Sequence, residues 1–97
     1  MTSSIEKYFS LKGHFPNEDF IGWILRRATT LSLTGGVAQL NEKEIYLTVS
    51  GHPILVDAME VACNLGPIDA SVDLIIEENQ PLPEEDRQSA LIIRYFG

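Results

Sequence analysis

Two hydrophobic spacings alternate along this chain, and their order limits the possible folds more than any other feature. In residues 5–11 every second side chain falls on one face, with Phe9 and Leu11 among them, which is the period of a strand with one buried face. Residues 19–31 and 53–65 instead repeat their apolar side chains every three or four positions, as amphipathic helices do. Strand spacing returns between and after these helices, at residues 37–40, 44–50, 72–76 and 90–96.

The resulting order is βαββαβ with an additional C-terminal strand. It predicts an α+β fold of the ferredoxin-like, or split βαβ, sandwich type. Right-handed crossovers in such a fold place both helices on one face of an antiparallel sheet. We expect the apolar side chains to meet between these two layers, including Val72, Leu74 and Ile76 of the fourth strand. The 97 residues are enough for one such domain, residues 1–97, and too few for two.

Glycine, proline and short polar residues predict where these segments end. Gly13 and Pro16 end the first strand, and Asn17 is the expected N-cap of the first helix. The Thr-Gly-Gly sequence at residues 34–36 separates that helix from the second strand. Residues 77–88 are polar and acidic and contain two prolines, so they are expected to form a loop.

Charge and composition exclude several classes of partner. Seven basic and fourteen acidic side chains give a net charge of -7, which repels phosphate backbones and anionic lipids. We therefore expect neither nucleic-acid nor membrane binding. No basic stretch precedes an apolar run at the N-terminus, and no apolar segment approaches the roughly 20 residues of a membrane span, so a cytoplasmic location is expected. Cys63 is the only cysteine, and its place in the apolar helical pattern predicts a core residue rather than a reactive thiol.

From residue 13 to about residue 72 the sequence resembles the acylphosphatases in a register without gaps. The resemblance rests on loop and core positions, namely Gly13, Phe20, Ala28, Leu31, Leu33, Thr34, Gly35, Val37, Leu40, Gly51, Gly66, Pro67, Val72 and Asp73. Acylphosphatases hydrolyse the carboxyl-phosphate bond of small acylphosphates without a metal. The resemblance therefore implies no cofactor and a phosphate site in the loop before the first helix.

In that family a glycine-rich loop offers backbone N–H groups to the phosphate, an arginine grips it, and an asparagine on the second strand orients the attacking water. Here Ile21 occupies the arginine position and Gln39 the asparagine position. The loop also contains Pro16, which has no N–H to donate, and Glu18 and Asp19 add negative charge beside a bound anion. Losing such an electrostatic clamp lowers the rate on the order of a thousandfold or more. No catalytic residue of the family type is expected.

These changes favour an acylphosphatase-like domain without acylphosphate hydrolase activity, acting as a binding or regulatory module. Its candidate ligand-binding residues are His14, Asn17 and Gln39, and its partner is a small molecule or a protein. The alternative is a weak or altered acylphosphatase that uses the same loop, with His14 and Gln39 in the active site. No metal site is expected, because the predicted topology places His14 and His52 at opposite ends of the sheet. A monomer or a weak homodimer is expected, since an open sheet edge can pair with a second copy.

Overall fold

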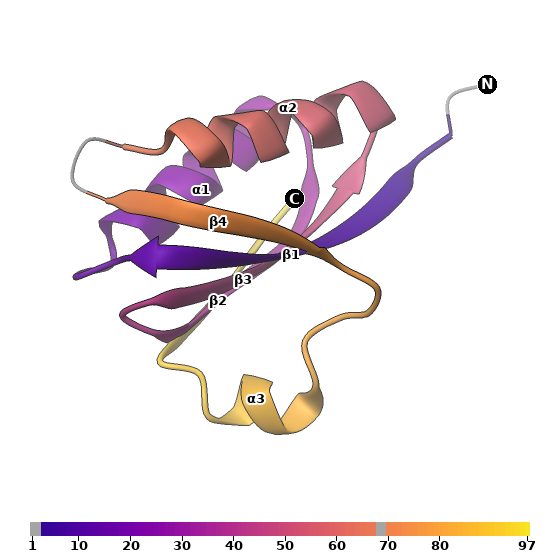
Figure 1. The fold of residues 1–97 in the computed structure, drawn as a ribbon. Coiled ribbons are helices and arrows are strands. Elements are labelled where there is room, and N and C mark those ends of the chain that lie inside the picture. The colour runs from indigo at the N-terminus through magenta and orange to yellow at the C-terminus, as the bar shows by residue number, and fades with distance from the viewer. Residues whose placement is uncertain (1–2, 68–69) are drawn as a thin grey trace.

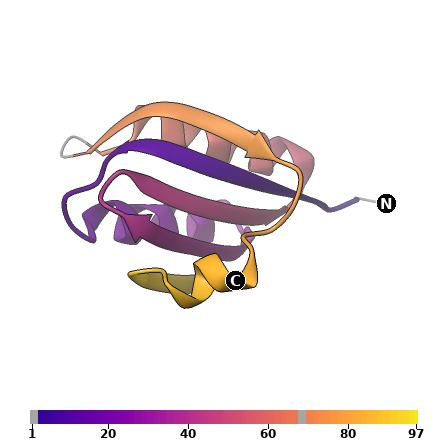
Figure 2. The same cartoon turned by 60° about the horizontal axis from the view of Figure 1, so that its bottom comes forward.

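The computed structural model describes residues 3–67 and 70–97, which form a sheet with two long helices packed on one side of it (Figures 1 and 2). The elements in chain order are β1 (Ile5–His14), α1 (Asp19–Thr30), β2 (Thr34–Asn41), β3 (Glu44–Gly51), α2 (Pro53–Leu65), β4 (Ser71–Glu78), α3 (Glu84–Gln88) and β5 (Ile92–Phe96). Neighbouring strands are antiparallel, in the order β4-β1-β3-β2-β5. The predicted α+β ferredoxin-like sandwich with an additional strand is confirmed.

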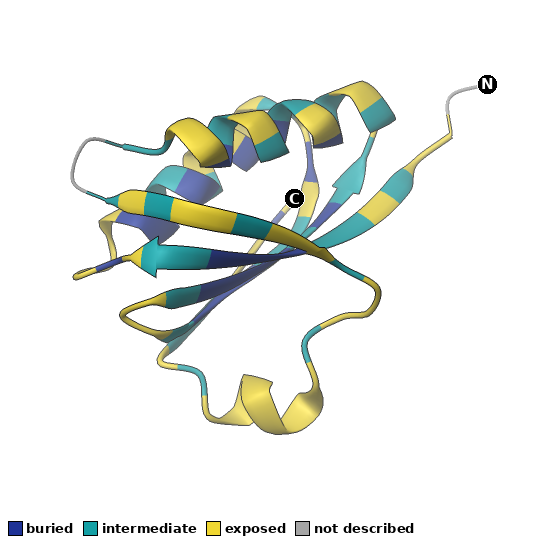
Figure 3. Ribbon diagram, viewed as in Figure 1, coloured by how far each residue is buried: buried dark blue, intermediate teal, exposed yellow. Residues whose placement is uncertain are grey.

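The hydrophobic core lies between the sheet and the two long helices, where the buried segments of both layers face each other (Figure 3). The buried residues of α1 are Phe20, Ile21, Ile24 and Ala28, and those of α2 are Val56, Met59 and Cys63. The central strands β1 and β3 contribute Phe9, Leu11, Ile45, Leu47 and Val49. Full burial of each large apolar side chain favours folding by about 1.5–3 kcal/mol. The helical and strand spacings place these side chains on one face of each layer, so packing the two faces together buries them.

The segment after β4 departs most from the prediction, because residues 84–88 form the short helix α3 where a loop was expected. This helix lies on the face of the sheet opposite α1 and α2 (Figures 1 and 2). Its first turn is acidic, which suits the positive end of the helix dipole. Tyr46 anchors the segment, since its hydroxyl donates a hydrogen bond to the backbone carbonyl of Gln80. None of the helices within the described ranges is long and apolar enough to cross a membrane.

A β-bulge in β4 reverses the predicted direction of two side chains. Val72 and Leu74 face successive residues of β1, so the intervening Asp73 is an extra residue in the ladder. One extra residue shifts the alternation of side chains by one position. Val72 and Ile75 therefore pack against the core, whereas Leu74 and Ile76 lie on the other face with 52% and 38% of their surface exposed. The expectation that Leu74 and Ile76 meet the helices is wrong.

Several boundaries also differ from those expected, and β5 begins at Ile92 rather than at residue 90. β1 continues to His14, and β2 begins at Thr34 because the backbone of the Thr-Gly-Gly sequence pairs with β3. The N-cap of α1 is Glu18 rather than Asn17. Oδ1 of Asn17 still accepts a hydrogen bond from the N–H of Asp19, at 2.8 Å. This Asx-type contact precedes a helix that begins at Asp19, one residue later than an N-cap at Asn17 would place it.

Cys63 is 1% exposed within the core, and burial raises the pKa of its thiol to about 12. At pH 7 a thiol with that pKa is ionised to about one part in 10⁵. We therefore expect an aromatic disulfide reagent to leave Cys63 unmodified in the folded protein and to modify it completely in denaturant, as followed by the absorbance of the released thiolate. Rapid modification of the folded protein would contradict the buried position.

Candidate functional site

The loop between β1 and α1, residues 15–18, is held against the turn between β2 and β3 by backbone hydrogen bonds. The N–H of Gly13 donates to the carbonyl oxygen of Lys43 at 3.0 Å, and the N–H of Phe15 donates to that of Glu42 at 2.7 Å. A phosphate-binding loop needs such N–H groups free and directed at the anion. Here both groups are already bonded to protein carbonyls.

Gly13 is required by strand pairing, whether or not a ligand binds. A Cβ atom at this position would lie 1.9 Å from the carbonyl oxygen of Ser71 on β4. Only glycine fits where β1 passes so close to the start of β4. The glycine at which the acylphosphatase resemblance begins is thus explained by the sheet itself.

The side chain of Phe15 fills the space behind the loop. It is fully buried and meets Phe20 of α1 edge to face, with the ring centroids 5.0 Å apart. The ring of Phe20 lies in turn 5.5 Å from that of Trp23, at the edge of the core. The cavity left beside these rings has a volume of about 20 Å³, which is room for about one water molecule and too little for a phosphate group.

Gln39 holds the same loop from the side of β2. Its side chain is buried, and Nε2 donates to the carbonyl oxygens of Phe15 at 3.1 Å and Asn41 at 3.3 Å. A primary amide has two N–H donors, and both are used in these contacts. The amide at the position that orients water in the acylphosphatases therefore stabilises the loop here.

Ile21 places no guanidinium where the acylphosphatases have their arginine. Ile21 is 3% exposed and belongs to the core, on the side of α1 that faces the sheet. Lys12 forms an ion pair with Glu44 of β3. Arg27 lies over the ring of Trp23, with its guanidinium carbon 5.6 Å from the ring centroid. Neither cation takes the position of the missing arginine.

The three residues predicted to bind a ligand all lie at or beside the loop, but they differ in exposure. His14 is exposed at the end of β1, Asn17 is exposed and lines the small cavity of about 20 Å³, and Gln39 is buried behind the loop. His52 is the N-cap of α2, next to the end of β3, and therefore lies at the other end of the sheet from His14. Among the residues that the structure describes, no three His, Cys, Asp or Glu side chains are grouped so that they could hold a metal ion.

Replacing Gln39 by methionine should lower the free energy of unfolding by about 1–3 kcal/mol, because the carbonyls of Phe15 and Asn41 lose a buried donor. Methionine keeps the volume of the side chain, so the change reports the hydrogen bonds. Urea unfolding followed by Trp23 fluorescence measures it. The matched control is Gln80→Met at an exposed position, for which we expect a change below about 0.5 kcal/mol. Equal effects at the two positions would contradict the role of Gln39.

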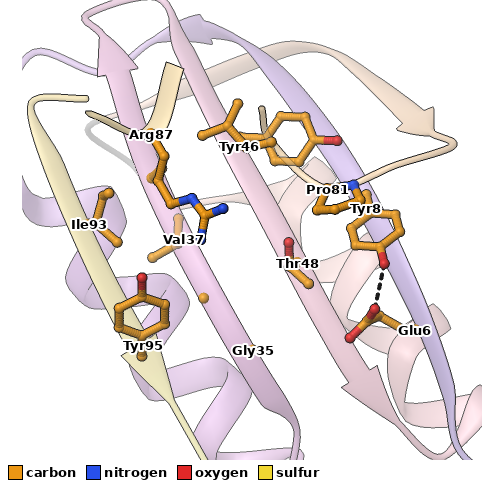
Figure 4. A pocket seen from close by; sticks show the side chains of 13 residues that line it. Glu6, Tyr8, Gly35, Val37, Tyr46, Thr48, Pro81, Arg87, Ile93 and Tyr95 are labelled. Atoms are coloured by element: carbon orange, nitrogen blue, oxygen red, sulfur yellow. Dashed lines mark hydrogen bonds between the residues drawn. The ribbon is translucent and has the colours of Figure 1, made fainter. Parts of the chain in front are cut away.

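A second and larger pocket lies on the face of the sheet opposite the two long helices, beside α3 (Figure 4). Its volume is about 350 Å³, and residues of β1, β2, β3 and β5 line it together with the segment that contains α3. The sequence patterns did not lead us to expect this pocket. The available signal was the placement of Tyr8, Tyr46 and Tyr95 on the strand positions that face away from the helices, where the core does not require an aromatic ring.

Solved structures identify the fold. An acylphosphatase from Bacillus subtilis aligns with 84% of this chain and 90% of its own length, at 15% identity and a TM-score of 0.72. An acylphosphatase from Coxiella burnetii aligns with 84% of this chain and 85% of its own length, at 20% identity and a TM-score of 0.73. The chain has an acylphosphatase-like fold.

This acylphosphatase-like chain also aligns with a part of a larger protein. The structure of full-length HypF in the phosphate- and nucleotide-bound form matches 84% of this chain over 11% of its own length, at 15% identity and a TM-score of 0.61. No protein-family model and no curated protein matches the sequence. The similarity therefore shows the fold alone, and the function of the acylphosphatase-like chain has to be argued from its own residues.

Proposed function

We propose that this acylphosphatase-like domain does not hydrolyse acylphosphates and acts as a binding or regulatory module. The observation that carries the proposal is the closed loop, in which the N–H groups of Gly13 and Phe15 bond to carbonyls of the β2–β3 turn. Hydrolysis of the acylphosphatase type needs free loop amides at the phosphate, together with a guanidinium that matches two of its oxygens. Phe15 fills the space behind the loop, and Ile21, which lies in the core, supplies no guanidinium.

The charge around the loop also supports this proposal. Glu18 and Asp19 are exposed at the start of α1, where an acylphosphate would bring further negative charge. Lys12, the lysine nearest the loop in the sequence, is paired with Glu44.

Steady-state hydrolysis of benzoyl phosphate tests the proposal. We expect the rate with the folded protein to equal the rate in buffer, while an authentic acylphosphatase in the same assay gives rapid turnover. Turnover well above buffer that is lost in His14→Ala and kept in His52→Ala would contradict the proposal. It would favour the altered acylphosphatase, with His14 as the active group at the loop. The hydrogen bonds of Gln39 to the loop and to Asn41 weigh against that alternative, because they leave its amide N–H groups no role toward a water.

The same proposal includes the oligomeric state and the location: the protein is a monomer or a weak homodimer in the cytoplasm. It binds a small molecule or a protein, and it binds neither nucleic acid nor membranes. The sheet edges are β4 and β5, and β4 also exposes Leu74 and Ile76. Such an edge can pair weakly with a second copy. Light scattering over a range of protein concentrations should give the mass of a monomer or a concentration-dependent dimer, and a stable higher oligomer would contradict this.

A further inference from the structure

The pocket on the face of the sheet away from the helices, which we call the open-face pocket, is built around one cross-strand row of side chains. Tyr8, Thr48, Gly36 and Tyr95 stand opposite one another on β1, β3, β2 and β5. From Tyr8 to Tyr95 the row crosses three strand spacings, about 14 Å in all. Only a threonine and a glycine lie between the two tyrosines. The row therefore forms a trough with a tyrosine on each side and Thr48 at its floor (Figure 4).

Gly36 sets the position of one wall of this trough. A Cβ atom on Gly36 would lie 2.9 Å from Cδ1 and 3.2 Å from Cε1 of Tyr95, so the glycine lets the tyrosine ring lie down against β2. Tyr95 is nonetheless 71% exposed. One part of the Tyr95 ring thus rests on β2, and most of the surface of the Tyr95 side chain is available to a ligand.

The segment that leads into α3 covers the trough. Tyr46, in the next cross-strand row, binds the carbonyl of Gln80 through its hydroxyl and so fixes the path of this segment. Burial raises the pKa of Tyr46, with a further contribution from the charge of Glu78, so the hydroxyl stays a hydrogen-bond donor to a higher pH than an exposed tyrosine would. The segment before α3 is therefore held beside the pocket by a hydrogen bond as well as by chain connectivity.

Arg87 brings a positive charge into the open-face pocket. Its side chain extends from α3 toward the strands, on the side of the pocket away from Tyr8 (Figure 4). Its guanidinium is 3.2 Å from the carboxylate of Glu84, but the two side chains are 46% and 74% exposed. An exposed pair of this kind contributes at most about 1 kcal/mol, so the guanidinium can take a second anionic partner. The pocket also contains Glu6, whose carboxylate already accepts the hydroxyl hydrogen bond of Tyr8.

We propose that the open-face pocket binds a small planar aromatic carboxylate, with its ring between Tyr8 and Tyr95 over Thr48 and its carboxylate on Arg87. This inference rests on the proposed function, since it gives the binding module a site and a class of ligand. Tyrosine rings stack with planar aromatic groups, and the guanidinium fork matches the two oxygens of a carboxylate. A volume of about 350 Å³ lies at the small end of the range for ligand pockets. The pocket is separated by the sheet from the loop that the resemblance indicated.

Titration of the isotope-labelled protein with 2-naphthoate, followed by two-dimensional amide NMR, tests the proposal. The expected result is saturable shifts at Gly36, Thr48 and Tyr95. Arg87→Gln should weaken 2-naphthoate binding about fivefold, the loss of an exposed ion pair, and should not change the binding of the uncharged analogue 2-naphthamide. Tyr95→Ala should weaken the binding of both compounds. The matched control is Arg26→Gln, an exposed arginine of α1 on the other side of the sheet, which should change neither.

Three results would overturn this assignment: no saturable shift with 2-naphthoate, saturable shifts confined to residues 14–19, or equal affinity of the parent protein and Arg87→Gln. Amide spectra of each variant establish that it is folded, so a lost signal is read as lost binding. Hydrolysis of benzoyl phosphate by the same sample would contradict the proposed function without affecting the shifts at this pocket. Failure of 2-naphthoate to bind, with no hydrolysis, would overturn the pocket assignment alone.

Discussion

Ile21→Arg is expected to lower the free energy of unfolding by about 3–5 kcal/mol, because it leaves an unpaired charge at a position that belongs to the core. Small domains are stable by only about 5–15 kcal/mol, so this one substitution removes a large share of the total. Phosphate binding should not appear, because the amides of Gly13 and Phe15 remain bonded to the β2–β3 turn. Urea unfolding of the variant measures the first effect, and a phosphate titration measures the second.

The matched control for this variant is Ile21→Val, which removes one methylene and should lower the free energy of unfolding by about 0.5–1.5 kcal/mol. Adding Gln39→Asn to Ile21→Arg restores both acylphosphatase residue types, and the double variant should be less stable still without hydrolysing benzoyl phosphate. An Ile21→Arg protein as stable as the parent would show that this side chain can reach solvent. Appearance of hydrolysis in the double variant would show that the loop opens readily, and would contradict a loop closed by its bonds to the β2–β3 turn.

Phe15→Ala is expected to lower the free energy of unfolding by about 3–5 kcal/mol, the range for removing a buried aromatic ring. The ring fills the space behind the loop and contacts Phe20, so its removal leaves a cavity at the point where β1 enters α1. A double-mutant cycle with Phe20→Ala should give a coupling of about 0.5–1.5 kcal/mol between the two rings. The measurement is again urea unfolding, under identical conditions for all four proteins.

Two control variants separate the cavity from general effects of losing apolar surface. Phe15→Leu should lower the free energy of unfolding by less than Phe15→Ala does, because most of the volume is kept. Leu65→Ala truncates a side chain that is 80% exposed and should change stability by less than about 0.5 kcal/mol. If Phe15→Ala were no more destabilising than Leu65→Ala, the ring would not be packed as the structure has it.

The fold was predictable because it depends on residues close together in the sequence. The alternation around Phe9 and Leu11 and the helical spacing from Phe20 to Ala28 each define a buried face, and burial of those faces places the helices on the sheet. Which side chains of β4 face the core was not predictable in the same way. Its bulge at Asp73 depends on pairing with β1, a strand about sixty residues earlier in the chain, and one extra residue changes which side chains face the core.

The acylphosphatase-like loop could be located from the sequence, but the contacts that the loop makes could not be predicted. The acylphosphatase resemblance indicated the loop after Gly13 and the substitutions at Ile21 and Gln39. It did not indicate that the loop binds the β2–β3 turn or that Phe15 fills the space behind it. The backbone bonds join segments more than twenty residues apart, and local residue preferences carry no information about them. The helix α3 was missed because residues 84–88 bury no side chain and so have no apolar periodicity.

A titration of the isotope-labelled protein with inorganic phosphate, read at the backbone amides of residues 13–22, tests most directly whether the loop is closed to anions. The N–H groups of Gly13 and Phe15 are already bonded to carbonyls of the β2–β3 turn, and Pro16 has no N–H to donate. We expect these amides to shift no more with phosphate than with chloride at the same ionic strength. Saturable, phosphate-specific shifts centred on Phe15 and Phe20 would show an open anion site at the loop and would contradict the closed state.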